Sequence, residues 1–168
     1  MPITRTPMVD DDGSGTSGTV VNNNWKVELY DQIDAAIGPA LGLWTDVPFD
    51  AANFSVYSAG TWTVAPANIV SHAYMIIGKT MWLAFVASSM TVAGAPNFLR
   101  VKLPGGRTAA RHTVMPFNLY DGQAANGVGY AQCTAGSGTV DFLRDLVGTP
   151  WGSGSMHVHA GNLIIPFA

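Results

Sequence analysis

The chain has 168 residues and a formal net charge of −3, with 11% charged and 48% hydrophobic residues. This length fits one domain with a hydrophobic core, and it is too short for two ordinary domains once the polar N-terminal stretch is set aside. No run of about 18 apolar residues occurs, which argues against a membrane-spanning segment, and the acidic balance argues against a nucleic-acid partner.

The N-terminal residues 1–21 combine prolines, three consecutive aspartates and the tract GSGTSG, with almost no apolar surface to bury. Such a segment is flexible when free and becomes ordered only on a partner. It also lacks the apolar core of a secretory signal, so we expect synthesis in a cytoplasm. We therefore predict an anchoring arm, whose docking side chains would be Ile3, Met8, Val9, Asp10, Asp11 and Asp12.

Residues 22–38 are predicted to form one short amphipathic helix. Three asparagines at 22–24 are good N-cap residues, and Gly38 followed by Pro39 is a stop signal. The apolar side chains recur every four residues and make one narrow stripe, which either packs on the chain's own β domain or meets two further copies of itself. The stripe consists of Trp25, Leu29, Ile33 and Ile37.

The remainder, 39–168, is predicted to be a β head, because from Phe54 onward apolar residues alternate with polar ones and turn signals are frequent. The fold class expected is mainly β, an antiparallel jelly-roll sandwich of about eight strands. The predicted strands are Thr61–Val64, two strands between Ala73 and Val86 joined at Gly78-Lys79, Phe98–Leu103, Met115–Leu119, Val128–Cys133, Thr139–Leu143 and His157–Phe167.

One predicted strand, Thr80–Val86, is apolar on both faces. Met81, Leu83 and Phe85 share one face, and Trp82, Ala84 and Val86 share the other. An antiparallel sandwich buries only one face of a strand in its core, so the second face needs another element or another subunit to cover it. This pattern and the low charge favour a closed homo-oligomer.

Four basic residues, Arg100, Lys102, Arg107 and Arg111, form the best candidate for contact with a polyanion such as an acidic glycan. Salt bridges to an acidic neighbouring subunit or helix, which would use Glu28, Asp31 or Asp34, are an alternative, and so is a solvated surface. Aromatic residues near loops could stack on sugar rings, although aromatics of a β domain more often lie in the core or an interface. These are Trp44, Tyr57, Tyr120 and Trp151.

Catalytic and metal-binding patterns are weak. His157 and His159 point to the same side of a strand and are minor metal candidates, with ordinary surface histidines the favoured interpretation. The single cysteine, Cys133, is predicted to be a buried strand residue. Only three carboxylates follow residue 50, and two carboxylates must face a sugar cleft in a glycosidase. We expect a non-enzymatic protein without a cofactor.

Three segments carry a resemblance to a known family. GTWTV (60–64), GKTMWLAFVASSMTVAGAPNFLRVKLPGG (78–106) and DDGSGTSGTVVNNNWKVELYDQID (11–34) resemble bacteriophage virion proteins, the trimeric jelly-roll heads of fibre, receptor-binding and capsid-appendage proteins. The resemblance implies a homotrimer with tumour-necrosis-factor-like heads, attached to other virion proteins by the N-terminal segment. It also implies aromatic packing around the threefold axis, for which Trp82 and Phe85 are the candidates.

The short N-terminal segment argues against a long tail fibre and favours a short fibre or a decoration protein of the capsid or neck. The alternative is a receptor-binding head that recognises a host surface glycan or an outer-membrane protein. The first hypothesis assigns function to residues 1–24, and the second assigns it to the loops around 104–111 and 151–159.

Overall fold

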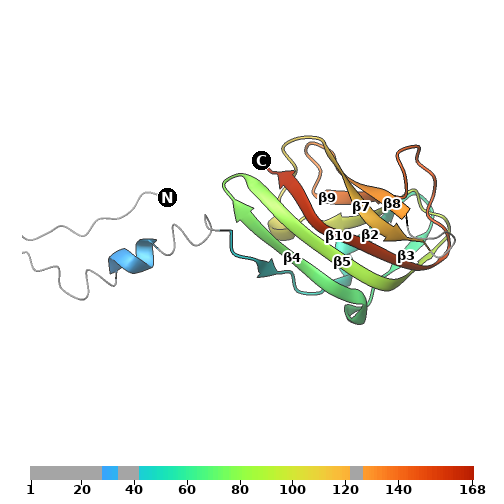
Figure 1. Cartoon of the computed structure of the whole chain (residues 1–168), viewed down its shortest axis with the longest axis horizontal. Helices are drawn as coiled ribbons and strands as arrows, with labels where there is room; N and C mark the ends of the chain where they lie inside the picture. The colour runs from blue at the N-terminus through green and yellow to red at the C-terminus, as the bar shows by residue number, and fades with distance from the viewer. Residues whose placement is uncertain (1–27, 34–41, 122–126) are drawn as a thin grey trace, which may run out of the picture. The chain divides into compact units, whose positions relative to one another are not determined.

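The computed structural model describes residues 28–33, 42–121 and 127–168, and it divides the chain into two units with the boundary between Gly42 and Leu43 (Figure 1). Each unit is considered by itself. The predicted arm over residues 1–21, with all six of its proposed docking side chains, lies outside the described residues.

Residues 28–33 are helical. Leu29 and Ile33, one turn apart, are partly buried, whereas Tyr30 is 62% exposed. The amide Nε2 of Gln32 donates a hydrogen bond of 3.3 Å to Oε1 of Glu28, a pairing that four-residue spacing on a helix allows. The prediction of a helix is confirmed for this turn and a half, while Trp25 and Ile37 lie outside the described residues.

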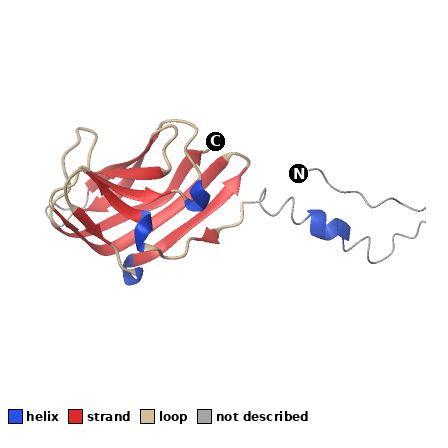
Figure 2. Ribbon diagram, turned by 180° about the vertical axis from the view of Figure 1, so that it is seen from behind, coloured by secondary structure: helices blue, strands red, loops and turns tan. Residues whose placement is uncertain are grey.

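The unit Leu43–Ala168 is mainly β, a curled antiparallel sheet of the sandwich or jelly-roll type (Figures 1 and 2). The eight predicted strands are all present, and two short ones were not predicted. The strands are β1 (Thr45–Asp46), β2 (Phe54–Tyr57), β3 (Thr61–Thr63), β4 (Ile69–Ile77), β5 (Thr80–Ala93), β6 (Phe98–Lys102), β7 (Thr113–Tyr120), β8 (Gly127–Cys133), β9 (Thr139–Leu143) and β10 (Gly154–Pro166).

The strand order is β1-β4-β5-β10-β7-β8-β9-β6-β2, with β3 paired to β5 off this path. The ring of Phe85 in β5 lies 5.5 Å from that of Phe142 in β9 and 6.0 Å from that of Phe54 in β2, between centroids. Neither β9 nor β2 is a neighbour of β5 in the sheet. The sheet therefore curls until its two halves pack face to face around an apolar core.

Turn chemistry agrees with this topology. Gly78 has a φ of 60° and is the first residue of the two-residue turn between β4 and β5, where Ile77 pairs with Thr80. Glycine with positive φ at that position is typical of a type II′ hairpin turn, whose twist suits the flanking strands. A 3₁₀ turn, Pro104–Gly106, follows β6.

Close packing inside the curl requires glycine at position 129 of β8. A Cβ there would lie 2.5 Å from Cδ2 of Leu119 and 2.7 Å from the backbone oxygen of Leu143. By contrast, a Cβ on Gly161 of β10 would meet nothing within 4 Å, and neither glycine has a positive φ. Packing therefore requires a glycine at position 129 but not at position 161.

Candidate functional site

Strands β4, β5 and β10 present an apolar surface on the side away from the core. Met75 of β4 and Ile164 of β10 both pair with Trp82 of β5, so the three side chains form one row across the sheet. Ala73 pairs with Ala84 in the next row. We call this surface the outer face, and it comprises Ser71, Ala73, Met75, Ile77, Trp82, Ala84, Val86 and Ile164.

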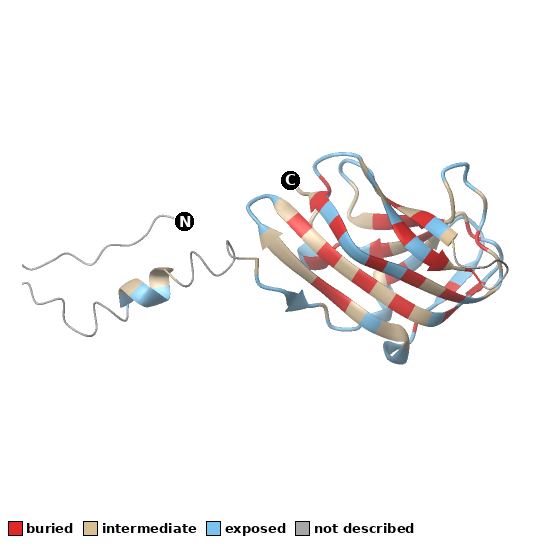
Figure 3. Cartoon of the chain, viewed as in Figure 1, coloured by how far each residue is buried: buried red, intermediate tan, exposed pale blue. Residues whose placement is uncertain are grey.

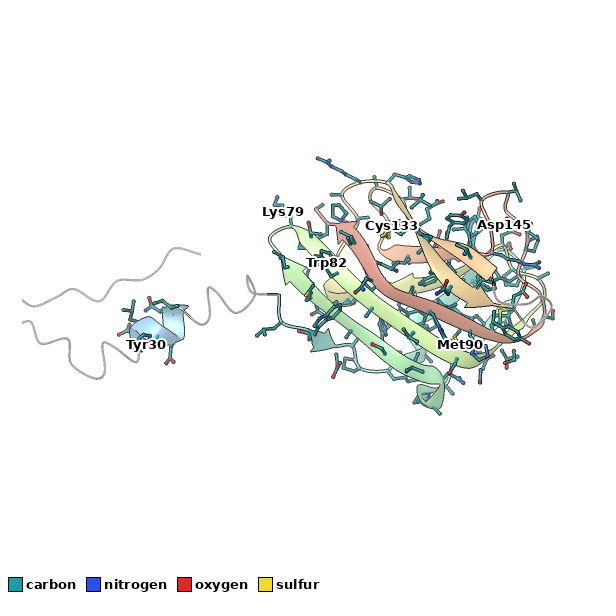
Figure 4. All side chains as sticks on the ribbon, in the orientation of Figure 1. Tyr30, Lys79, Trp82, Met90, Cys133 and Asp145 are labelled. Carbon is teal, nitrogen blue, oxygen red and sulfur yellow. The ribbon has the colours of Figure 1, made fainter. Side chains whose placement is uncertain are left out.

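The outer face is partly covered: Ala73 is buried, and the other members are partly buried or exposed. Ile77 is 45% exposed and Ile164 is 41% exposed, while Trp82 and Met75 are partly buried. Figure 3 shows the alternation of buried and less buried residues along β4, β5 and β10, and Figure 4 labels Trp82 on β5 near the hairpin at Lys79. The sequence-based prediction that Thr80–Val86 is apolar on both faces is therefore confirmed, and the described part of the head covers one of these faces only partly.

Phe85 does not belong to that surface, and its assignment to a trimer interface is wrong. It is completely buried and packs edge-on against His72, with 5.4 Å between ring centroids. Trp82 and Phe85 differ by an odd number of positions on one strand, so their side chains point to opposite sides of the sheet. Only Trp82 is available to a partner subunit.

The basic run is not a free cationic patch. Arg100 forms a two-pronged ion pair with Asp141 across β6 and β9, with Nε 2.8 Å from Oδ1 and Nη2 3.1 Å from Oδ2. Its guanidinium also lies 4.6 Å from the ring centroid of Tyr57. The predicted acidic partner on a neighbouring subunit or helix is replaced here by a carboxylate of the same head.

The other three basic residues do not share a common partner: Arg107 has contacts of its own, and Lys102 and Arg111 are exposed. Arg107 donates to the carbonyl oxygen of Pro104 at 3.4 Å, and its guanidinium lies 5.1 Å from the ring of Phe167. Lys102 and Arg111 are exposed. Two of the four predicted polyanion-binding residues thus have intrachain partners that compete with a ligand.

Trp151 is also wrongly predicted as a ligand-binding residue, because it is completely buried. Its indole Nε1 donates a 3.0 Å hydrogen bond to the carbonyl oxygen of Phe142, and its backbone N donates to the carbonyl oxygen of Pro96. These bonds fasten the segment between β9 and β10 to the core. Trp151 therefore has a structural role, while Trp44 and Tyr57 are about half exposed, at 47% and 49%.

A cavity of about 530 Å³ opens where β7 and β8 meet β10. Tyr120 of β7 pairs with His157 of β10, and their rings meet edge to face at 5.3 Å between centroids. The ring of His157 is also 6.3 Å from that of His159. The described residues that line the cavity are Asn118, Leu119, Tyr120, Gly127, Val128, His157 and His159.

Three further side chains of the head, Asp121, Asp145 and Cys133, are buried or paired within the fold. The buried carboxylate of Asp121 forms an ion pair with Arg144, with 2.6 Å between Oδ2 and Nε. Oδ1 of Asp145 accepts hydrogen bonds from the backbone N of Val147 and Thr149, and the bonds from Thr149 hold the pKa of Asp145 below its ordinary value. Cys133 is buried as predicted, and burial raises the pKa of its thiol to about 12.

His72 is a buried histidine of the aromatic core. It is 6% exposed, contacts Phe54 and Phe85, and its Nε2 has no hydrogen-bond partner. Burial disfavours the charged imidazolium and lowers its pKa from 6.5 to about 4.

Within the described ranges no group of three or more histidine, cysteine or acidic side chains is placed to hold a metal ion. No helix among those residues is long and apolar enough to cross a membrane. Compared with protein-family models, with curated proteins and with solved structures, the chain matches none of them.

Sequence reasoning missed the grouping of Tyr120 and Asn118 with the two histidines. The single local signal was the H-x-H spacing of 157 and 159, which places both imidazoles on one side of a strand. The pairing of β10 with β7 joins residues 37 positions apart, from Tyr120 to His157, and no local pattern indicates it.

Proposed function

We propose that this chain is a non-enzymatic structural protein of a bacteriophage particle, a homotrimeric short fibre or a capsid or neck decoration protein. Residues 1–21 would anchor it to other virion proteins, and the β heads would project outward. It would be made in the cytoplasm of the bacterial host and would reside in the virion.

The outer face is the observation that carries the proposal. Its rows from Ser71 to Ile77 extend about 20 Å along β4 and β5, and Ile164 adds one position on β10. An apolar patch on the order of a few hundred Å² is as large as the largest patch of an ordinary soluble monomer, and such patches are often functional. A second copy of the chain is the occupant we propose, because the segment 78–106, which contains Trp82, is among those that resemble trimeric virion heads.

The state of the carboxylates supports a non-enzymatic role. Asp121 and Asp141 are each paired with an arginine, and Asp145 holds the turn that follows β9. These three are all the carboxylates after residue 50. A hydrolase of the glycosidase type needs two carboxylates facing one substrate, and none of these three lines the cavity at His157.

A second candidate function is a receptor-binding module that recognises a host surface glycan. The cavity beside Tyr120 and His157 favours it, because concave sites with a few convergent polar groups are the usual form of small-ligand sites. The cavity lies on the β7–β8–β10 strands; it includes His157 and His159 from the predicted segment 151–159 and no residue of the basic run 100–111.

Deletion of residues 1–21 separates the two functions. The full chain is expected to bind virions that were prepared without it, and the shortened chain is expected to lose that binding while remaining folded by circular dichroism. If the shortened chain still binds virions, the anchoring role of residues 1–21 is wrong. If it binds host cells instead, the receptor-binding function is favoured.

A further inference from the structure

The lining of the cavity at β7, β8 and β10 has an unusual uniformity of chemistry. Its polar side chains are one amide, one phenol and two imidazoles, contributed by Asn118, Tyr120, His157 and His159. Each of these groups can both donate and accept a hydrogen bond when the imidazoles are neutral. No carboxylate, lysine or arginine is among the described lining residues.

The strand geometry turns these groups toward one place. The pairing of β10 with β5 is irregular at two places: between Met156 and Val158, where β5 holds the extra residue opposite His157, and between Ala160 and Leu163, where β10 holds it. Bulges of this kind bend a strand and redirect its side chains, and they are frequent beside functional sites. His159 is exposed and His157 is partly buried against Tyr120, so one imidazole is fixed and the other is open to a ligand.

Apolar groups complete the lining. Val128 is 56% exposed, and the ring of Tyr120 contributes further carbon surface. A ligand that matches this lining has many hydroxyl groups, each able to donate and accept, and C–H faces between them. The ligand need not be charged, because the described lining holds no carboxylate, lysine or arginine that would pair with a charge.

We propose that this cavity binds a neutral saccharide of one or two sugar units. Its volume of about 530 Å³ lies within the range of small-molecule sites, roughly 300–1,000 Å³. The absence of a carboxylate from its described lining means that the site binds sugar without cleaving it. This inference rests on the second candidate function and names its site and its class of ligand.

Saturation-transfer NMR with the full chain and a panel of glucose, galactose, N-acetylglucosamine, lactose and maltose tests the proposal. At least one sugar is expected to receive saturation and to shift the imidazole proton signals of His157 and His159. The chain has only four histidines, so the signals of His72 and His112 serve as internal references that should not move.

Matched variants locate the site. His157→Phe keeps a ring against Tyr120 and removes the hydrogen-bonding nitrogens, and it is expected to weaken sugar binding about tenfold or more. His112→Ala, an exposed histidine outside the cavity, is expected to leave binding unchanged. Equal thermal unfolding temperatures for both variants would show that the fold is retained.

Three results would overturn the proposal: no saturation transfer to any sugar of the panel, an unchanged affinity for the sugar in His157→Phe, or histidine shifts produced by Zn²⁺ alone and by no sugar. The molar mass of the same sample, read by light scattering, separates the two proposals. A trimer that binds no sugar removes the saccharide site and leaves the structural function standing.

Discussion

The buried histidine His72 makes the stability of the head depend on pH in a way that one substitution can isolate. Its pKa is about 4 in the folded state against an ordinary value of 6.5. Between these two pH values the unfolded chain binds more protons than the folded chain, so stability falls as pH falls through this window. Above pH 6.5 the imidazole is neutral in both states, and this penalty is absent.

The size of the effect follows from the pKa. Each pKa unit corresponds to about 1.4 kcal/mol, so lowering the pH from 7 to 4.5 should cost about 2.5 kcal/mol of unfolding free energy through His72. His72→Phe removes the titrating group and also the buried Nε2 that lacks a partner, in a site already formed by Phe54 and Phe85. The variant is expected to equal or exceed the native chain in stability at pH 7.

Urea unfolding followed by tryptophan fluorescence at pH 7 and pH 4.5 measures the difference, at one fixed protein concentration because association would also contribute. Carboxylates also titrate between these pH values in both proteins. The effect of His72 is therefore the loss of unfolding free energy of the native chain minus that of His72→Phe. His112→Gln, at an exposed histidine, is the control and should behave like the native chain. The reasoning is refuted if His72→Phe loses as much stability as the native chain does.

Three further predictions concern packing, an ion pair and a thiol. Gly129→Ala should lower the unfolding free energy by about 1–3 kcal/mol through overpacking, whereas Gly161→Ala should change it by less than about 0.5 kcal/mol. Urea unfolding measures both values, and similar losses for the two variants would contradict the packing described for Gly129. Asp141→Asn should lower the unfolding free energy by about 1–3 kcal/mol, and a double-mutant cycle with Arg100→Met should give a coupling energy of about 1 kcal/mol. A coupling energy of about zero would contradict the prediction. Cys133 should resist a thiol reagent such as DTNB in the native protein and react fully in urea; rapid reaction of the native thiol would show that it is accessible.

The strands that could be predicted are those whose information is local. β6 alternates apolar and polar residues, and β5 is apolar on both faces over Thr80–Val86. The turn at Gly78 identifies β4 as the hairpin partner of β5. β1 has only two residues, both exposed, and β2 has only four, so neither provides enough alternation to be recognised.

The site assignments failed where a partner is distant in the chain. Trp151 stands between Pro150 and Gly152, a composition typical of a loop, yet its indole is buried. Its Nε1 donates a hydrogen bond to the carbonyl oxygen of Phe142, and its backbone N donates one to the carbonyl oxygen of Pro96. Arg100 meets its acidic partner 41 positions away. The two candidates Trp82 and Phe85 were incompatible from the start, because alternation along one strand sends them to opposite faces.

The central claim is that a second copy of the chain covers the outer face, and the molar mass of the native chain at micromolar concentration, read by light scattering, tests it most directly. The prediction is three times 17.7 kDa for the native chain and a monomer for Ile164→Lys, which places a charge next to Trp82 at the β10 end of its row. Val147→Lys, on the segment before β10 and 89% exposed, should remain a trimer. A native chain that is a 17.7 kDa monomer, or an Ile164→Lys variant that stays a trimer, would contradict the claim.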